Sequence, residues 1–409
     1  MDDLIKLAAV DDSKYSDYRY DVILNAYKWD PQVEDSNTVS RHAVLLSQQT
    51  AEDLAHMAEQ LSAETMKTEE LLVKNPEAYA KELGISRSLK KALRGLEGYN
   101  SDSHVRLMRF DFHPSETGWA VSEVNSDVPG GFAEASVLPQ IACRYLEGCV
   151  PGVDFSSVFT DALSSKIKKD GSIALVHATS YSDDRQVMQF IGDRLVQRGF
   201  RAVYAGPDHL RWQNRKAVSV LEGHEGDIDG IIRFFPLEWL ANLQKRTGWQ
   251  GYFSTITPSC NFPVSVFAQS KRLPLVWDRL GAEIPYWKSL LPETVKPELI
   301  DPEDRDWIYK PAFGRVGEGV SVWDAVSSKE LEDIRKSVKK NPEEWTAQRM
   351  FKSRALSSQR GGSYHLCIGV FTVNTEFAGF YGRISPTRRI DSKAEDIPVL
   401  IMKGGEIHG

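Results

Sequence analysis

The sequence has few of the features that mark secreted, membrane-spanning or redox-active proteins. It contains four cysteines in 409 residues, and none of them forms a C-x-x-C pair or a spacing typical of a metal site. No apolar run is long enough to cross a membrane as a helix. The N-terminal residues lack a basic stretch followed by a long apolar one, which is the mark of a secretory signal. These absences predict a cytoplasmic protein with no membrane contact and with free thiols.

Basic residues are not in excess either. There are 50 Lys and Arg against 57 Asp and Glu, for a net charge of −7. Without a strongly basic region, nucleic acid is not expected as a partner. The sequence also lacks a Walker A loop, the His-Arg-Asp and Asp-Phe-Gly motifs of protein kinases, and a G-x-G-x-x-G dinucleotide loop. Several common classes of nucleotide-binding protein are therefore excluded.

What is present is enough apolar sequence for two or three packed units, since 41% of the residues are hydrophobic. The apolar period predicts helix over residues 50–98, with Thr50 as a candidate cap and with interruptions at Gly84 and Gly95. Residues 133–148 also fit a helix. The chain thus begins with a largely helical part.

A strand, a helix and a strand follow over residues 173–204, and another strand is expected at residues 228–235. This order is typical of a β-α-β unit with a parallel sheet. The last third returns to strands separated by Pro and Gly turns. These expected strands are Trp307–Lys310, Val320–Trp323, Trp345–Phe351 and Ile368–Val373.

The first motif with chemical content is Arg109-Phe-Asp111, followed after a turn by Glu123-Val-Asn125. Residues two apart in a strand share a face, so each pair projects to one side. If Arg109 pairs opposite Glu123, all four polar groups converge, which requires an odd-length loop or a bulge. Two carboxylates and an amide oxygen suit Mg²⁺, and the arginine suits a phosphoryl group. The alternative is a solvated hairpin with an Arg–Glu cross-strand pair.

The second motif begins at Lys310-Pro311 and contains Gly314, Gly317 and Gly319. A lysine at a strand end followed by closely spaced glycines lets backbone N–H groups fold over phosphates while the ammonium neutralises them. A plain glycine turn between two strands is the alternative. About thirty residues after this motif, the expected strand Trp345–Phe351 contains Gln348. The Gln348 side chain could line an adenine pocket, or the strand could be an ordinary edge strand.

Together these motifs resemble the ATP-grasp superfamily, with the acidic hairpin before the lysine motif instead of after it. The order and the amino-acid sequences of several segments resemble those of the synthetase domain of glutathionylspermidine synthase and its stand-alone relatives. The matching segments are Trp29–Gln32, Arg109–Phe112, Glu123–Asp127 with Glu134, Lys271–Trp277, Leu291-Pro292, Lys310-Pro311 with Gly314-Arg315, Gln348, Gly369–Phe371 and Gly382-Arg383.

The resemblance implies roles for individual residues. Asp111, Glu123 and Asn125 correspond to metal ligands for Mg²⁺. Arg109 and Arg383 correspond to the pair that flanks the acyl phosphate. The residues implied at ATP are Lys310 at the phosphates, Gln348 near adenine, Lys271 as a second candidate near the nucleotide, and Gly314, Arg315, Gly317 and Gly319 in the covering segment. A lysine on a helix surface is the alternative for Lys271.

The resemblance also implies an α/β (α+β) fold, a circularly permuted ATP-grasp with a Rossmann-like pre-ATP-grasp β-α-β domain. Residues 1–165 would form a helical region plus the metal-binding half. Residues 166–275 would form the β-α-β domain, and residues 276–409 the nucleotide-binding half with its glycine-rich lid.

Departures from the family concern its substrates. Where members that use glutathione carry Ser and Cys side chains, this sequence has Val128, Gly130 and Gly131. An acidic pair that meets the polyamine in the family corresponds to Asp183-Asp184. The catalytic residues therefore match better than the substrate pockets do.

The leading hypothesis is an ATP- and Mg²⁺-dependent ligase that joins a small-molecule carboxylate to an amine through an acyl phosphate. One alternative is an ATP-binding scaffold or sensor with reduced turnover. Another is a small-molecule kinase that uses the same site. The sequence leaves the acid, the amine and the oligomeric state open.

Overall fold

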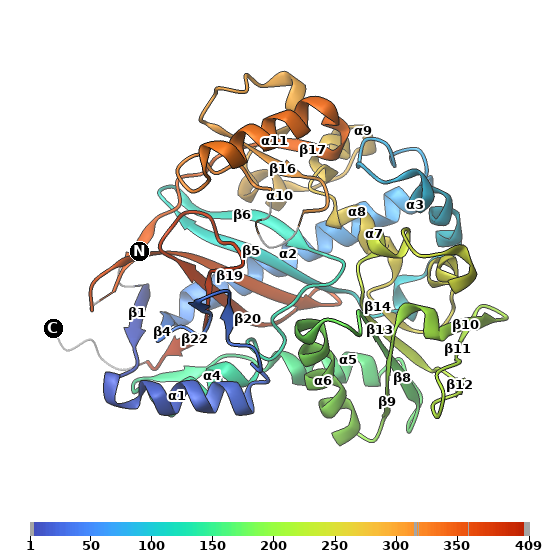
Figure 1. Ribbon diagram of the computed structural model, residues 1–409, viewed down its shortest axis with the longest axis horizontal. Coiled ribbons are helices and arrows are strands. Elements are labelled where there is room, and N and C mark those ends of the chain that lie inside the picture. The colour runs from blue at the N-terminus through green and yellow to red at the C-terminus, as the bar shows by residue number, and fades with distance from the viewer. Residues whose placement is uncertain (1–3, 315–316, 318, 359, 405–409) are drawn as a thin grey trace.

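The computed structural model describes residues 4–314, 317, 319–358 and 360–404. At its centre lies an antiparallel sheet built from two distant parts of the chain (Figure 1). A first hairpin, β5 (Leu107–Ser115) and β6 (Gly118–Asn125), pairs with a second, β19 (Ser363–Val373) and β20 (Glu376–Ser385), through β5 and β19. The short strands β18 (Ala355–Ser357) and β21 (Glu395–Ile397) extend it.

Helix α2 (Gln48–Val73) covers one face of this sheet. Met108, Phe110 and Phe112 of β5 are fully buried on that side, in one cluster with Leu54 and Leu61 of the helix. Because side chains alternate along a strand, the residues between these three point to the opposite face. The strand period therefore decides which side of the sheet carries polar chemistry.

Two of the predicted helices differ from expectation. Ser47, not Thr50, caps α2, since its hydroxyl accepts the Thr50 N–H at 3.1 Å. The helix ends at Val73, before Asn75-Pro76, because the residue before a proline is disfavoured in helical conformation. The expected helix over 133–148 is reduced to α4 (Val137–Ala142), because Pro139 lacks the N–H that an earlier start requires.

The β-α-β prediction is confirmed. Parallel strands follow the order β14 (Ser259–Cys260), β13 (Gly230–Phe234), β8 (Ser172–His177) and β9 (Arg201–Ala205). Helices α5 (Phe155–Ser164) and α6 (Ser182–Gln197) pack with this unit. A small sheet of β10 (Leu210–Gln213), β11 (Lys216–Ser219) and β12 (Gly226–Asp227) extends from it.

The lysine motif lies in a separate antiparallel sheet of β15 (Thr294–Val295), β17 (Trp345–Arg349) and β16 (Trp307–Pro311), covered by α11 (Ser328–Lys340). The predicted strand Val320–Trp323 is wrong. This segment runs beside β16, but the Tyr309 N–H donates to the Ser321 hydroxyl at 2.7 Å instead of to a partner carbonyl. A side chain that takes a ladder bond prevents regular pairing.

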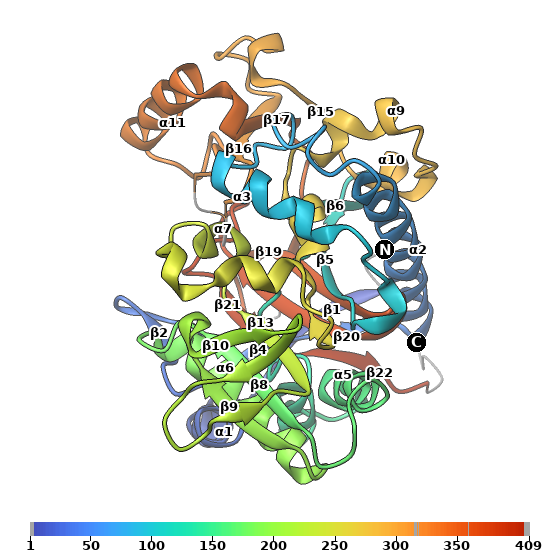
Figure 2. The same ribbon diagram turned by 90° about the vertical axis from the view of Figure 1, so that its right-hand side faces the viewer.

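Another sheet joins β1 (Ile5–Ala9), β4 (His42–Leu46), β22 (Val399–Met402) and β7 (Cys149–Pro151), with α1 (Asp12–Asn25) and α4 against it. Figure 2 shows the central sheet between the α11 unit and the parallel sheet. The remaining elements are β2 (Gln32–Val33), β3 (Ser36–Asn37), α3 (Arg87–Ala92), α7 (Leu237–Leu240), α8 (Val266–Gln269), α9 (Trp277–Leu280) and α10 (Pro285–Leu290).

Within the described ranges, none of the helices combines the length and the apolar character that crossing a membrane demands. The three-part division of the chain stays a prediction.

Candidate functional site

The hairpin of β5 and β6 gathers the acidic motif on one face of the central sheet. Asp111 pairs opposite Glu123, and Arg109 pairs opposite Asn125, so the register that pairs Arg109 with Glu123 is not the one formed. Phe112 pairs with Val121, which leaves Ser122 as the extra residue of a bulge. The bulge shifts the register by one residue, as the convergence of the four side chains requires. The predicted convergence of all four groups is therefore correct.

Arg109 and Asp111 form a close ion pair within this cluster. The guanidinium donates from Nε to Asp111 Oδ1 at 2.8 Å and from Nη2 to Oδ2 at 3.1 Å. Its Nη1 donates to the Gly130 carbonyl at 2.7 Å, and Asn125 donates to Asp111 Oδ2 at 3.0 Å. Gly369 of β19 makes room for the arginine, because a Cβ there would lie 2.6 Å from Arg109 Cδ. The pair is held rigidly against the sheet.

Glu123 is held by Lys271, which follows α8. Lys271 Nζ lies 2.9 Å from Glu123 Oε2 and donates to the Gly314 carbonyl at 2.6 Å. Burial raises the pKa of Glu123, but the charges of Lys271 and Lys310 outweigh burial and lower it to about 2. Glu123 is therefore ionised at neutral pH, and Lys271 links the acidic hairpin to the glycine segment.

Lys310 comes from the other sheet and reaches the same place. Its Nζ donates to Gln348 Oε1 at 2.7 Å and to the Ser122 carbonyl, in the bulge, at 3.0 Å. Burial lowers the pKa of Lys310 to about 8, although Glu123 opposes that shift. Gln348 in turn donates to the Thr294 hydroxyl at 3.1 Å. The structure thus brings Lys310, Gln348 and Lys271 together with the acidic motif.

The glycine segment lies close to the strand end that carries Lys310. Gly317 has φ +67°, and a Cβ there would lie 2.7 Å from the Ile390 carbonyl oxygen. Gly319 has φ +70° and packs on Pro311. Both positions favour glycine for conformational reasons. Arg315, also predicted at the nucleotide, lies outside the described residues.

Arg383 joins the cluster from β20. It pairs opposite Cys367 of β19, while Gly369, two residues on, pairs with Asp111. This register places Arg383 on the same face as the acidic motif. The guanidinium donates to the Asp391 carbonyl. Burial opposes its charge, but Tyr381 and Asp396 raise the pKa of Arg383 above its usual value.

Sequence reasoning missed two members of this site. Tyr381 of β20 lies against Arg109, whose Cζ is 4.9 Å from the centre of its ring. His113 is buried beside Ser122, and burial lowers its pKa to about 4. Strand alternation was the available signal, because Tyr381 stands two residues before Arg383 and His113 two after Asp111.

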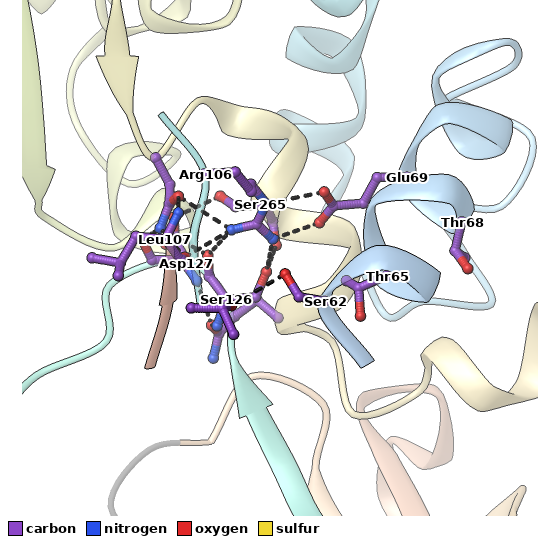
Figure 3. Close-up of polar contacts among 12 residues, drawn as sticks. Ser62, Thr65, Thr68, Glu69, Arg106, Leu107, Ser126, Asp127 and Ser265 are labelled. Atoms are coloured by element: carbon purple, nitrogen blue, oxygen red, sulfur yellow. Dashed lines mark hydrogen bonds and ion pairs between the residues drawn. The ribbon is translucent and has the colours of Figure 1, made fainter. Parts of the chain in front are cut away.

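A buried network of charges lies behind the hairpin (Figure 3). Arg106 donates to both oxygens of Glu69, at 3.0 and 2.6 Å, and to the Ser126 carbonyl at 2.7 Å. Asp127 pairs with Arg233 of β13 and accepts the Ser265 hydroxyl at 3.0 Å. The four charged side chains are at most 4% exposed. This network joins α2, the hairpin and the parallel sheet immediately after Asn125.

No three His, Cys, Asp or Glu side chains gather as a metal site within the part of the chain that the structure describes. The predicted set has two carboxylates and one amide. These groups can hold Mg²⁺ when water molecules and phosphate oxygens supply its other ligands. Asp111 and Glu123 are paired across the hairpin and both face cations. This donor set fits a hard divalent cation bound together with a phosphate ligand.

Comparison with known proteins identifies the family. The family described as glutathionylspermidine synthase preATP-grasp matches residues 14–402. The chain belongs to the glutathionylspermidine synthase family. The predicted fold class is confirmed: the family is of the ATP-grasp type, and the fold is a circularly permuted ATP-grasp with a parallel β-α-β unit. Membership supports a synthetase or ligase as the general class of this enzyme.

Among solved structures, a glutathione synthetase-like effector from Globodera pallida, in its apo form, matches with a TM-score of 0.62 at 10% identity. The match covers 96% of this chain and 97% of that one and concerns the fold alone. A putative gamma-glutamylcysteine synthetase from Methylobacillus flagellatus KT matches with a TM-score of 0.43 at 12% identity, over 83% and 88% of the two chains. No curated protein matches the sequence.

Proposed function

We propose that this protein is an ATP- and Mg²⁺-dependent ligase that joins a small-molecule carboxylate to an amine. The observation that carries the proposal is the meeting of two motifs from different sheets. The carboxylates of Asp111 and Glu123 face the ammonium groups of Lys271 and Lys310, with Arg109 at their side. Such a mixed cluster suits Mg²⁺ and a polyphosphate, which satisfy both signs of charge.

In this proposal Asp111, Glu123 and Asn125 hold Mg²⁺, which when bound supplies charge neutralisation at the phosphate oxygens. Lys271 and Lys310 turn their ammonium groups from Glu123, Gly314 and Gln348 toward the phosphates. Gln348 lies at the adenine end, and Gly314, Gly317 and Gly319 cover the nucleotide.

The reaction has two steps. A carboxylate oxygen of the acid attacks the γ-phosphorus, and the bond from that phosphorus to the bridging oxygen of ADP breaks. The amine nitrogen then attacks the acyl carbon, phosphate leaves, and the nitrogen loses a proton to solvent. Arg109 and Arg383 flank the reacting group and stabilise the charge on its oxygens. No side-chain nucleophile is needed.

The acid is proposed not to be glutathione. Gly131 has φ +98°, and a Cβ there would lie 2.9 Å from the Tyr381 ring, so this position has no room for a side chain. A Cβ at Gly130 would point toward Phe234 at 3.8 Å. These positions offer no polar side chain to a peptide thiol.

The experiment is an ADP-release assay with Mg²⁺·ATP over panels of acids and amines, with hydroxylamine as a trap for acyl phosphates. The expected result is ADP release that requires an acid and yields a hydroxamate. A stable phosphorylated product without hydroxamate would identify a small-molecule kinase instead. ATP binding without ADP release for any pair would identify a scaffold or sensor.

A further inference from the structure

The aromatic ring of Tyr381 lies beside the Arg109 guanidinium in the site. Its ring stands 4.9 Å from Arg109 Cζ, and Gly131 packs against the ring from the adjoining loop. The negative face of an aromatic ring attracts a guanidinium, most strongly where water is displaced. Arg109 spends three of its five N–H groups on Asp111 and Gly130, as far as the described residues show. The ring adds a contact to the guanidinium plane that these hydrogen bonds do not supply.

The ring is itself held in place from behind. The Tyr381 hydroxyl donates to Asp396 Oδ1 at 2.7 Å, and Asp396 Oδ2 lies 2.5 Å from Lys28 Nζ. Lys28 also pairs with Glu134 at 3.2 Å. The side chains of Lys28, Glu134 and Asp396 are at most 15% exposed. A buried triad, in which one ammonium group lies between two carboxylates, therefore fixes the phenol.

The same triad also lies beside the second arginine. Asp396 pairs opposite Arg383 between β20 and β21. The Asp396 backbone is fixed as well, since its N–H donates to the Thr38 carbonyl at 2.7 Å and its carbonyl accepts from Ser40 at 3.0 Å. Contacts thus run from the segment after α1, through Asp396 and Tyr381, to Arg109.

We propose that Tyr381 is a positioning residue, which holds the Arg109 guanidinium with its ring and is itself held by Asp396 and Lys28. This inference rests on the proposed function, because it assigns the orientation of Arg109 to the phosphoryl-transfer step. It predicts that loss of the ring reduces turnover and leaves ATP binding unchanged. A mispositioned catalytic group can cost up to about 100-fold in rate.

The test compares two variants with a matched control pair. Tyr381→Leu removes the ring, and Tyr381→Phe keeps the ring but loses the bond to Asp396. Tyr79 has the same kind of ring contact in another part of the chain, with Arg279 4.4 Å from its ring. Tyr79→Leu and Tyr79→Phe are therefore the controls.

The kinetic arm uses the acid–hydroxylamine pair that gives the fastest ADP release, or intrinsic ATP hydrolysis if none does. The expected kcat falls by about 10- to 100-fold in Tyr381→Leu and by about 3-fold in Tyr381→Phe, with KM for ATP unchanged. Both Tyr79 variants are expected to keep the kcat of the wild type. Unchanged kcat in Tyr381→Leu, or equal losses in the Tyr79 controls, would overturn the proposal.

The second arm needs no substrate. The NMR signal of the Arg109 Nε–H, assigned through Arg109→Lys, should shift in Tyr381→Leu because the aromatic ring is removed, and less in Tyr381→Phe. A shift together with no turnover by any protein would overturn the proposed function but support the positioning role. An Arg109 signal that is identical in wild type and Tyr381→Leu would overturn the positioning role. If Tyr381→Leu fails to fold, Tyr381→Phe decides the same two readouts.

Discussion

Two arginine–carboxylate clusters lie only three residues apart in the chain, one at Arg106 just before β5 and one at Arg109 within it, and they differ in how completely they are closed. In the inner network, Arg106 pairs with Glu69 and Arg233 with Asp127, with side chains at most 4% exposed. In the outer cluster, Arg109 pairs with Asp111 and Lys271 with Glu123, with exposures of 10% to 21%. The two clusters share residue types but not surroundings.

The inner network is saturated by the protein itself. Arg106 alone donates to a carboxylate, two carbonyls, a hydroxyl and an amide oxygen. A charge so fully paired has nothing left for a ligand, and its removal exposes an uncompensated partner. The outer cluster faces a second sheet and a glycine segment. Its charged groups can therefore replace their contacts with one another by contacts with a bound ligand. The comparison teaches that partners and closure, more than residue type, separate structural charges from functional ones.

The largest expected effect is on stability and comes from the inner network. Glu69→Met leaves Arg106 buried without its carboxylate, and we expect the free energy of unfolding to fall by about 3–5 kcal/mol. Urea denaturation measures the loss, and the kcat of the folded fraction should stay near that of the wild type. A loss of stability below about 1 kcal/mol would show that the network is not structural.

The next effect is on turnover and comes from the outer cluster. Asp111→Asn removes the negative charge of a proposed metal ligand but keeps the shape of the side chain, so the rate of ADP release should fall by about 100-fold or more. Unfolding free energy should fall by less than in Glu69→Met, because the amide keeps an oxygen that can accept from Arg109. The control is Glu116→Gln, an exposed carboxylate of the same hairpin. Equal activity of Asp111→Asn and the control would remove the distinction between the two clusters.

A smaller effect is the loss of stability at low pH, which comes from His104 next to the inner network. Burial lowers the pKa of His104 to about 4, from 6.5 in the unfolded chain. Below pH 6.5 the unfolded chain therefore binds more protons, so stability declines as the pH falls from 6.5 to 4, by about 2–3 kcal/mol. His104→Gln keeps an acceptor for the Ser259 N–H and removes the titration. Denaturation at several pH values should show a flatter profile for this variant, and parallel profiles would refute the assignment.

Much of the fold followed from local patterns in the sequence. Alternation along Arg109–Phe112 and Glu123–Asn125 predicted both faces of the hairpin, because strand period is a local property. The β-α-β unit was predicted for the same reason. The strand at Val320–Trp323 was wrong, since one hydroxyl of Ser321 replaces a ladder bond, and such competition is invisible to pattern and propensity.

The candidate site was less predictable than the fold. The register of Arg109 depended on the bulge at Ser122, which only the packed hairpin decides. The contact of Lys271 with Glu123 joins distant segments and follows from tertiary packing. Tyr381 and Asp396 carried no motif, so their link to Arg109 appeared only with the sheet in place.

The central claim is that Glu123 and its neighbours bind Mg²⁺ together with ATP. The most direct measurement is calorimetric titration of ATP with Mg²⁺ and with EDTA, in the wild type and in Glu123→Gln. The account predicts that Mg²⁺ tightens ATP binding by about 10-fold or more in the wild type and has little effect in Glu123→Gln. Equal ATP affinity of the wild type with Mg²⁺ and with EDTA, or no ATP binding at all, would contradict it.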